Sequence, residues 1–183
     1  AFLRPTIATM ADPSLLKDMD IAISRLVTAF ERQEKICIYG DYDVDGITAT
    51  VLLVEGLSRL GFLVGYHIPN RMDDGYGLSV EALTVISESG YQVAVSVDCG
   101  STSCIEAAAA RRLGLDLIIT DHHQLKDELP DAIAVINPHR SDSTFPDRNL
   151  SGVGVAFMVL IALRRQLRLG SYPSYQDIDL REL

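Results

Sequence analysis

Short apolar runs alternate with helical stretches along most of the chain, and this alternation constrains the fold more than any other feature. Runs such as Ile36-Cys37-Ile38 and Leu117-Ile118-Ile119 are apolar at consecutive positions, as a strand covered on both faces requires. Strands that alternate with helices at this spacing indicate βαβ units. We therefore predict an α/β fold, a doubly wound, mainly parallel five-stranded sheet with helices on both faces. Strands are expected at 35–39, 62–68, 91–97, 116–120 and 132–136, and helices at 15–32, 46–60, 79–89, 102–113 and 151–169.

Length and composition favour one folded domain. The 183 residues can bury a substantial core, and we predict a single domain over 1–183 with a helical lead-in over 1–34 and a linker-like tail over 170–183. No secretory signal is evident and the apolar run 153–163 is too short to cross a bilayer, so a cytoplasmic protein without membrane contact is expected. The three cysteines form no CxxC pair, which argues against structural zinc and disulfides.

The net charge of −9 argues against a protein that binds nucleic acid through a broad basic surface. That argument weakens where carboxylates gather to hold cations, and polar residues do follow each predicted strand. Ligands of open α/β sheets bind beyond the carboxyl ends of the strands, so one site is predicted there. The residues concerned are Asp41, Asp43 and Asp45 after the first strand, Arg71 and Tyr76 after the second, Asp98 after the third, Asp121, His122 and His123 after the fourth, and Asn137 after the fifth.

Three carboxylates at alternate positions, in the segment Gly40–Gly46, favour a metal site because they repel one another unless a cation lies between them. An N-cap role for Asp45 at the next helix would explain one of the three acids. An EF-hand is excluded, since its twelfth position needs a Glu and here is Leu52. The adjacent pair His122-His123 adds imidazole, which together with carboxylate suits Mn²⁺, whereas oxygen-only sites suit Mg²⁺. The alternative is that both histidines are ordinary surface residues.

The motif Asp121-His122-His123 resembles the one that gives the DHH phosphoesterases their name. Gly40–Gly46 and Val97–Gly100 resemble the first two motifs of the RecJ-type single-stranded-DNA exonucleases within that family. The segments 69–77, 137–138 and 152–157 fit the same pattern in the same order.

This resemblance implies metal-dependent phosphodiester hydrolysis with two divalent cations, Mn²⁺ or Mg²⁺, of which we favour Mn²⁺. The substrate would be single-stranded DNA, in repair and recombination, with single-stranded-DNA-binding protein and repair helicases as expected partners. The resemblance implies Asp43, Asp45, Asp98 and His122 as metal ligands, with Asp98 as a bridge and Asp41 as an additional candidate. It implies that His123, Asp98 and Asp121 are catalytic. The residues that would contact substrate are Arg71, Tyr76, Asn137, Gly152 and Gly154.

Two departures from the family pattern bear on these expectations. Tyr39 stands where many DHH enzymes have a His, and the family's later ligand Asp is not matched, because Asp177 and Asp179 lie in a sequence that does not fit. The predicted helix over 153–169 is apolar nearly all round, yet it lacks evident packing partners in so short a chain. We therefore expect the domain to be truncated at its C-terminal end, and residues 1–183 alone to bind metal poorly and to be largely inactive.

Other functions stay open at this point. A DHH enzyme for small phosphates, such as a pyrophosphatase or a cyclic-dinucleotide or oligonucleotide phosphodiesterase, would share these motifs. A phospho-receiver module also has acids after its first and third strands, but it needs a Lys where this chain has Asn137-Pro138. A non-catalytic fragment is the third alternative. A dinucleotide site is disfavoured, since no GxGxxG follows the first strand.

Overall fold

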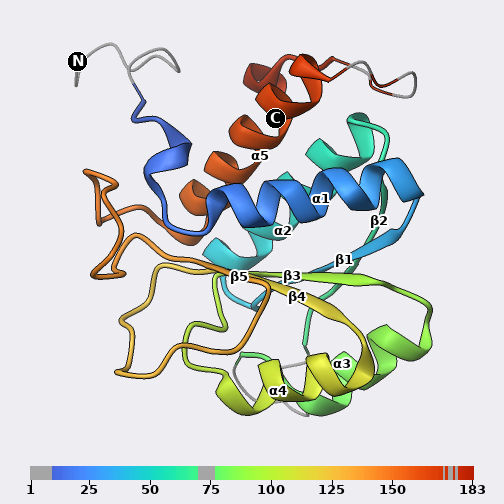
Figure 1. The fold of residues 1–183 in the computed structure, drawn as a ribbon, viewed down its shortest axis with the longest axis vertical. Helices are drawn as coiled ribbons and strands as arrows, with labels where there is room; N and C mark the ends of the chain where they lie inside the picture. The colour runs from blue at the N-terminus through green and yellow to red at the C-terminus, as the bar shows by residue number, and fades with distance from the viewer. Residues whose placement is uncertain (1–9, 70–76, 171, 173–174, 176) are drawn as a thin grey trace.

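The computed structural model describes residues 10–69, 77–170, 172, 175 and 177–183. Within these residues, a five-stranded sheet lies between two layers of helices (Figure 1). The strands are β1 (Lys35–Tyr39), β2 (Leu63–His67), β3 (Val93–Val97), β4 (Asp116–Thr120) and β5 (Ala134–Ile136). The helices are α1 (Met19–Arg32), α2 (Val44–Arg59), α3 (Val80–Glu88), α4 (Cys104–Leu113) and α5 (Gly152–Leu169), with short 3₁₀ turns at Pro13–Leu15 and Leu180–Glu182.

The sheet order is β2-β1-β3-β4-β5, and all neighbouring strands are parallel. Helices α1, α2 and α5 cover one face and α3 and α4 cover the other, as Figure 1 shows. The predicted fold class is therefore confirmed. In this order the chain reverses its direction of winding between β1 and β3, and ligands of such sheets bind at that switch point.

The α-helices start one to four residues away from the predicted positions, and two of these shifts have clear local reasons. The first helix begins at Met19 and not near residue 15, because Pro13–Leu15 form a separate turn that Asp12 caps. In addition, Asp18 has a left-handed backbone with φ 63°, which separates this turn from the helix. Helix α2 begins at Val44, two residues before the predicted start, because Asp43 caps it by accepting a hydrogen bond from the amide of Gly46. The alternative N-cap role given to Asp45 is thus wrong.

Helix α5 packs against both α1 and α2 on one face of the sheet. Gly56 of α2 allows a close approach, since a methyl group there would lie 2.6 Å from Cδ1 of Leu160. Leu160, Leu163 and Leu167 have no exposed surface. The expectation that this apolar helix lacks partners within the chain is wrong, because α1 and α2 flank it on two sides.

The described part of the tail, for which the sequence predicts a linker, packs on the same helical layer. Leu180 is buried, and Ile178 and Leu183 contact the core cluster that includes α1, α2 and α5. Asp177 also accepts a hydrogen bond from Nε of Arg164 at 2.9 Å. Among the described helices, none has the length and apolar character needed to cross a membrane.

Candidate metal centre

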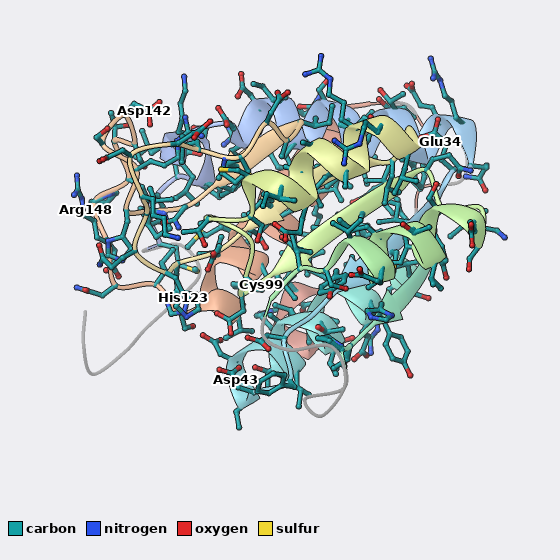
Figure 2. All side chains as sticks on the ribbon, turned by 90° about the horizontal axis from the view of Figure 1, so that it is seen from below. Glu34, Asp43, Cys99, His123, Asp142 and Arg148 are labelled. Atoms are coloured by element: carbon teal, nitrogen blue, oxygen red, sulfur yellow. The ribbon has the colours of Figure 1, made fainter. Side chains whose placement is uncertain are left out.

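Three neighbouring strands end in acidic or imidazole side chains at the same edge of the sheet. Asp41 and Asp43 follow β1, Asp98 follows β3, and His122 and His123 follow β4. Figure 2 shows Asp43, Cys99 and His123 gathered in one region, with Glu34, which precedes β1, at the far end of the molecule. The parallel register explains this, because strands that run the same way have their carboxyl ends side by side.

Asp98 lies at the centre of this edge. Its backbone has a left-handed φ of 63°, rare for a non-glycine residue, and its amide donates to the carbonyl of Thr120 at 3.0 Å. Its side chain is 1% exposed. Nε2 of His122 lies 3.0 Å from Oδ1 of Asp98, but the contact does not meet hydrogen-bond geometry, so Oδ1 has no hydrogen-bond partner among the described residues. A buried carboxylate oxygen in that condition is suited to a cation.

The electrostatics at Asp98 also favour a bound cation. Burial, together with the nearby carboxylates of Asp45 and Asp43, raises the pKa of Asp98 to about 7. These are the effects expected when acids are crowded out of water without a counter-charge. A divalent cation between them would remove both the repulsion and the cost of burying the charge.

Two groups of ligand atoms meet at this carboxylate. One is Asp98 with His122 and His123, the other is Asp41 with Asp43 and Asp98, and in each group the atoms lie within 4.8 Å of one another. Asp98 belongs to both, and a carboxylate has two oxygens with which to bridge. Mixed nitrogen and oxygen donors suit first-row divalent ions. The residues present therefore fit a pair of divalent cations that share Asp98.

The carboxylate of Asp121 is buried, and both of its oxygens accept hydrogen bonds. Its Oδ1 accepts from the amides of His122 and His123 and lies 2.7 Å from Nδ1 of His123, and its Oδ2 accepts from the amide of Ser101. Burial would raise the pKa of Asp121, but the hydrogen bonds from Ser101 and His123 outweigh it, and the pKa is lowered. Asp121 belongs to neither ligand group. The catalytic role predicted for Asp121 stays a prediction, and in this geometry its carboxylate contacts His123 directly.

His123 is held by this carboxylate. Burial would lower its pKa, but the hydrogen bond and charge of Asp121 outweigh burial, and the pKa of His123 is raised. With Nδ1 donating to Asp121, Nε2 is the nitrogen left for a ligand or a substrate oxygen. Its ring lies 4.6 Å from that of His122, centroid to centroid.

Asp45 does not belong to either ligand group, although it was predicted to be a metal ligand. Its Oδ2 accepts from the amide of Gly152 at 2.6 Å, and its Oδ1 accepts from the amide of Val153 at 2.8 Å. Oδ2 also lies 3.5 Å from Nε2 of His122, so the carboxylate adjoins the site while it caps α5.

The predicted substrate contacts are placed differently from expectation. Arg71 and Tyr76 lie outside the described residues. Asn137 has no exposed surface: its amide nitrogen donates to Oγ of Ser101 and the carbonyl of His123, and its oxygen accepts from the amide of His139. The prediction that Asn137 contacts substrate is therefore wrong, because the side chain points inward and joins three loops.

The amides at the start of α5 also have acceptors within the chain. Gly152 donates to Asp45, and Gly154 donates to Oγ of Ser151 at 3.2 Å. The substrate contacts predicted for Gly152 and Gly154 stay a prediction, and in this arrangement both amides donate within the chain.

Sequence reasoning missed the supporting residues. Ser101 binds both Asp121 and Asn137, and nothing in its local pattern distinguishes it from a turn residue.

Tyr39, at the position where many DHH enzymes have a His, is buried, and its hydroxyl donates to the carbonyl of Gly77 at 3.0 Å. Its ring lies 5.0 Å from that of His67.

A parallel sheet whose switch point gathers carboxylates and imidazoles defines an α/β domain with a candidate divalent-metal site. The chain belongs to the DHH family: the profile of the DHH family, N-terminal domain, matches residues 35–179. This family match and the predicted resemblance agree.

Individual relatives give the same result. The chain is 43% identical over 166 residues to the single-stranded-DNA-specific exonuclease RecJ of Bacillus subtilis, over 91% of this chain and 21% of that protein. It is 46% identical over 154 residues to RecJ of Salmonella typhimurium, over 84% of this chain and 27% of that protein. A crystal structure of exonuclease RecJ bound to manganese matches with a TM-score of 0.76 at 35% identity, over 86% of this chain and 40% of that chain. The chain thus spans about a quarter of the length of these two curated relatives.

Proposed function

We propose that this chain carries the metal-dependent, phosphodiester-hydrolysing site of a single-stranded-DNA exonuclease of the RecJ type. One observation carries the proposal: the buried carboxylate of Asp98 is shared by two groups of ligand atoms on neighbouring strand ends. The names of the relatives support single-stranded DNA as the substrate.

We propose two divalent cations, with Mn²⁺ favoured over Mg²⁺. His122 supplies a nitrogen donor beside the carboxylates, which suits Mn²⁺, and the matching RecJ structure is described as bound to manganese. Asp43, Asp98 and His122 are the proposed ligands, with Asp41 as an additional one. Asp45 completes the set of proposed ligands. Each of its carboxylate oxygens accepts one hydrogen bond from an amide and keeps a second lone pair for a metal ion.

When bound, such cations would activate a water molecule and offset the charge that develops on the phosphate. The chain's own groups would do the rest. Asp98 orients the ligand set from its fixed position between β3 and β4. His123, held at Nδ1 by Asp121, would present Nε2 to the scissile phosphate as a hydrogen-bond partner for its oxygens.

Substrate contact beyond the metals is assigned to Arg71 and Tyr76, through a guanidinium on a phosphate and a ring against a base. Arg71→Ala should lower the affinity for single-stranded DNA and reduce its salt dependence. An unchanged salt dependence would remove Arg71 from the substrate path.

The decisive assay compares four substrates with Mn²⁺: single-stranded DNA, duplex DNA, pyrophosphate and a cyclic dinucleotide. The assay uses the full protein as it exists. Asp98→Asn should abolish turnover of single-stranded DNA, whereas the matched control Asp20→Asn, on the exposed surface of α1, should keep it. Turnover of pyrophosphate or the cyclic dinucleotide without cleavage of DNA would instead establish a DHH enzyme for small phosphates.

The cellular setting follows from this substrate. We propose a cytoplasmic enzyme of DNA repair and recombination that works with single-stranded-DNA-binding protein and repair helicases. Titration calorimetry with single-stranded-DNA-binding protein tests the first partner, and the absence of heat at micromolar concentrations would remove it.

A further inference from the structure

The first turn of α5 reaches the site from a distant part of the chain. Its amides at Gly152 and Val153 donate to the two oxygens of Asp45 at 2.6 and 2.8 Å, across 107 and 108 residues of sequence. Hydrogen bonds to an ionised acceptor are shorter and stronger than neutral ones. Because α5 is buried between α1 and α2, these amides are fixed by the core.

The same turn also touches Asp98. A methyl group at Gly152 would lie 2.5 Å from Oδ1 and 2.7 Å from Cβ of Asp98, closer than real side-chain carbons approach. Nε2 of His122 contacts both carboxylates, at 3.0 Å from Asp98 and 3.5 Å from Asp45. Gly152 therefore lies against the point where these three side chains meet.

Helix formation alone does not explain a glycine here. Gly152 is not among the glycines with a left-handed backbone, so its backbone conformation does not require glycine. The close approach to Asp98 is the reason that the structure offers for the missing side chain.

We propose that the first turn of α5 is the positioning element of the metal centre. The amides of Gly152 and Val153 hold Asp45 in place. Because Gly152 has no side chain, Asp98 has the space it needs to contact His122. The positive end of the helix also offsets part of the repulsion between the carboxylates of Asp45 and Asp98. This inference rests on the proposed binding of divalent cations.

The test measures Mn²⁺ affinity, by electron paramagnetic resonance of free Mn²⁺, in the protein at its natural length. Gly152→Ala should weaken binding about 10-fold or more, the range seen when groups that orient metal ligands are changed. Gly154→Ala is the matched control, since its methyl group would be added to the same helical turn at 3.4 Å from its nearest neighbours, an ordinary contact. It should bind Mn²⁺ as the wild type does.

A second pair of variants tests the amides without changing a side chain of the site. Val153→Pro removes the donor to Oδ1 of Asp45, and Gly154→Pro removes the donor to Ser151. Proline is tolerated in the first turn of a helix, where amides have no intrahelical acceptor. Val153→Pro should weaken Mn²⁺ binding more than Gly154→Pro, and this pair decides the question if Gly152→Ala does not fold.

The outcomes separate the two claims. Loss of Mn²⁺ affinity in Gly152→Ala and Val153→Pro, with both Gly154 variants near the wild type, supports the inference. Wild-type affinity in Gly152→Ala and Val153→Pro overturns the inference and leaves the proposed function standing. Failure of the wild type itself to take up Mn²⁺ overturns both.

Discussion

Nε2 of His122 lies 3.0 Å from Oδ1 of Asp98, although the two residues follow different strands. The parallel register of β3 and β4 pairs Val97 with Thr120, so the chain leaves both strands at the same level. Asp98 is also the residue that the two groups of ligand atoms share.

Replacing Asp98 should cost more metal affinity than replacing any other single ligand. Asp98→Asn removes an anion that both ligand groups share, so we expect Mn²⁺ affinity to fall by about 100-fold or more, beyond the usual effect of an orienting group. Titration calorimetry measures this, with Asp20→Asn as the control. A larger loss in Asp43→Asn than in Asp98→Asn would contradict the bridging role.

Asp98 should also make the metal-free protein less stable as the pH rises. Its pKa is raised from an ordinary 3.8 to about 7, so the folded state binds this proton more tightly than the unfolded state does. The stabilisation is present below pH 3.8 and is lost as the pH rises to about 7. Thermal unfolding with EDTA should show Asp98→Asn to be more stable than the wild type at pH 8. The difference in stability between Asp98→Asn and the wild type should vanish or reverse near pH 4. A difference that does not change with pH would refute this account.

The two histidines should have separable effects. His122 contacts Asp98 directly, whereas Nδ1 of His123 is engaged by Asp121. We expect His122→Ala to lose Mn²⁺ affinity. His123→Ala should keep more of that affinity but lose about 100-fold in kcat, the lower range for general acid–base catalysis. Equal metal loss in both variants would show that this division of roles is wrong.

Asp121 should act only through His123. Asp121→Asn keeps an oxygen that can accept a hydrogen bond but removes the charge that helps to raise the pKa of His123. The protonated form of His123 should then be lost at lower pH, and the pH profile of kcat should shift toward acid while Mn²⁺ affinity changes little. A uniform loss at every pH, without a shift, would indicate only a structural role.

The sequence predicts β1 and β4 well because these strands are buried at nearly every position. β1 and β4 begin and end as predicted, at Lys35–Tyr39 and Asp116–Thr120, where apolar runs meet glycine, acid or amide residues. The position of the site follows from the same feature, because parallel strands place the residues after them at one edge.

The direction of individual side chains could not be predicted in this way. Asn137 follows a strand like the acids do, but it turns inward to Ser101 and His123. Asp45 was expected to serve the site or its own helix, and its carboxylate also accepts hydrogen bonds from the first turn of α5. Contacts from a side chain to backbone amides across 107 residues leave no periodic pattern in the sequence. The partners of α5 were missed because apolar packing between helices far apart in the sequence leaves no local pattern either.

The most direct test of the account is anomalous diffraction from crystals of the protein grown with Mn²⁺. We predict anomalous density at the carboxyl edge of the sheet, within coordination distance of Asp98 and of at least one of His122 and Asp43, and absent from Asp98→Asn crystals. Density found only elsewhere, or none at this edge at saturating Mn²⁺, would contradict the claim that Asp98 is the centre of a divalent-metal site.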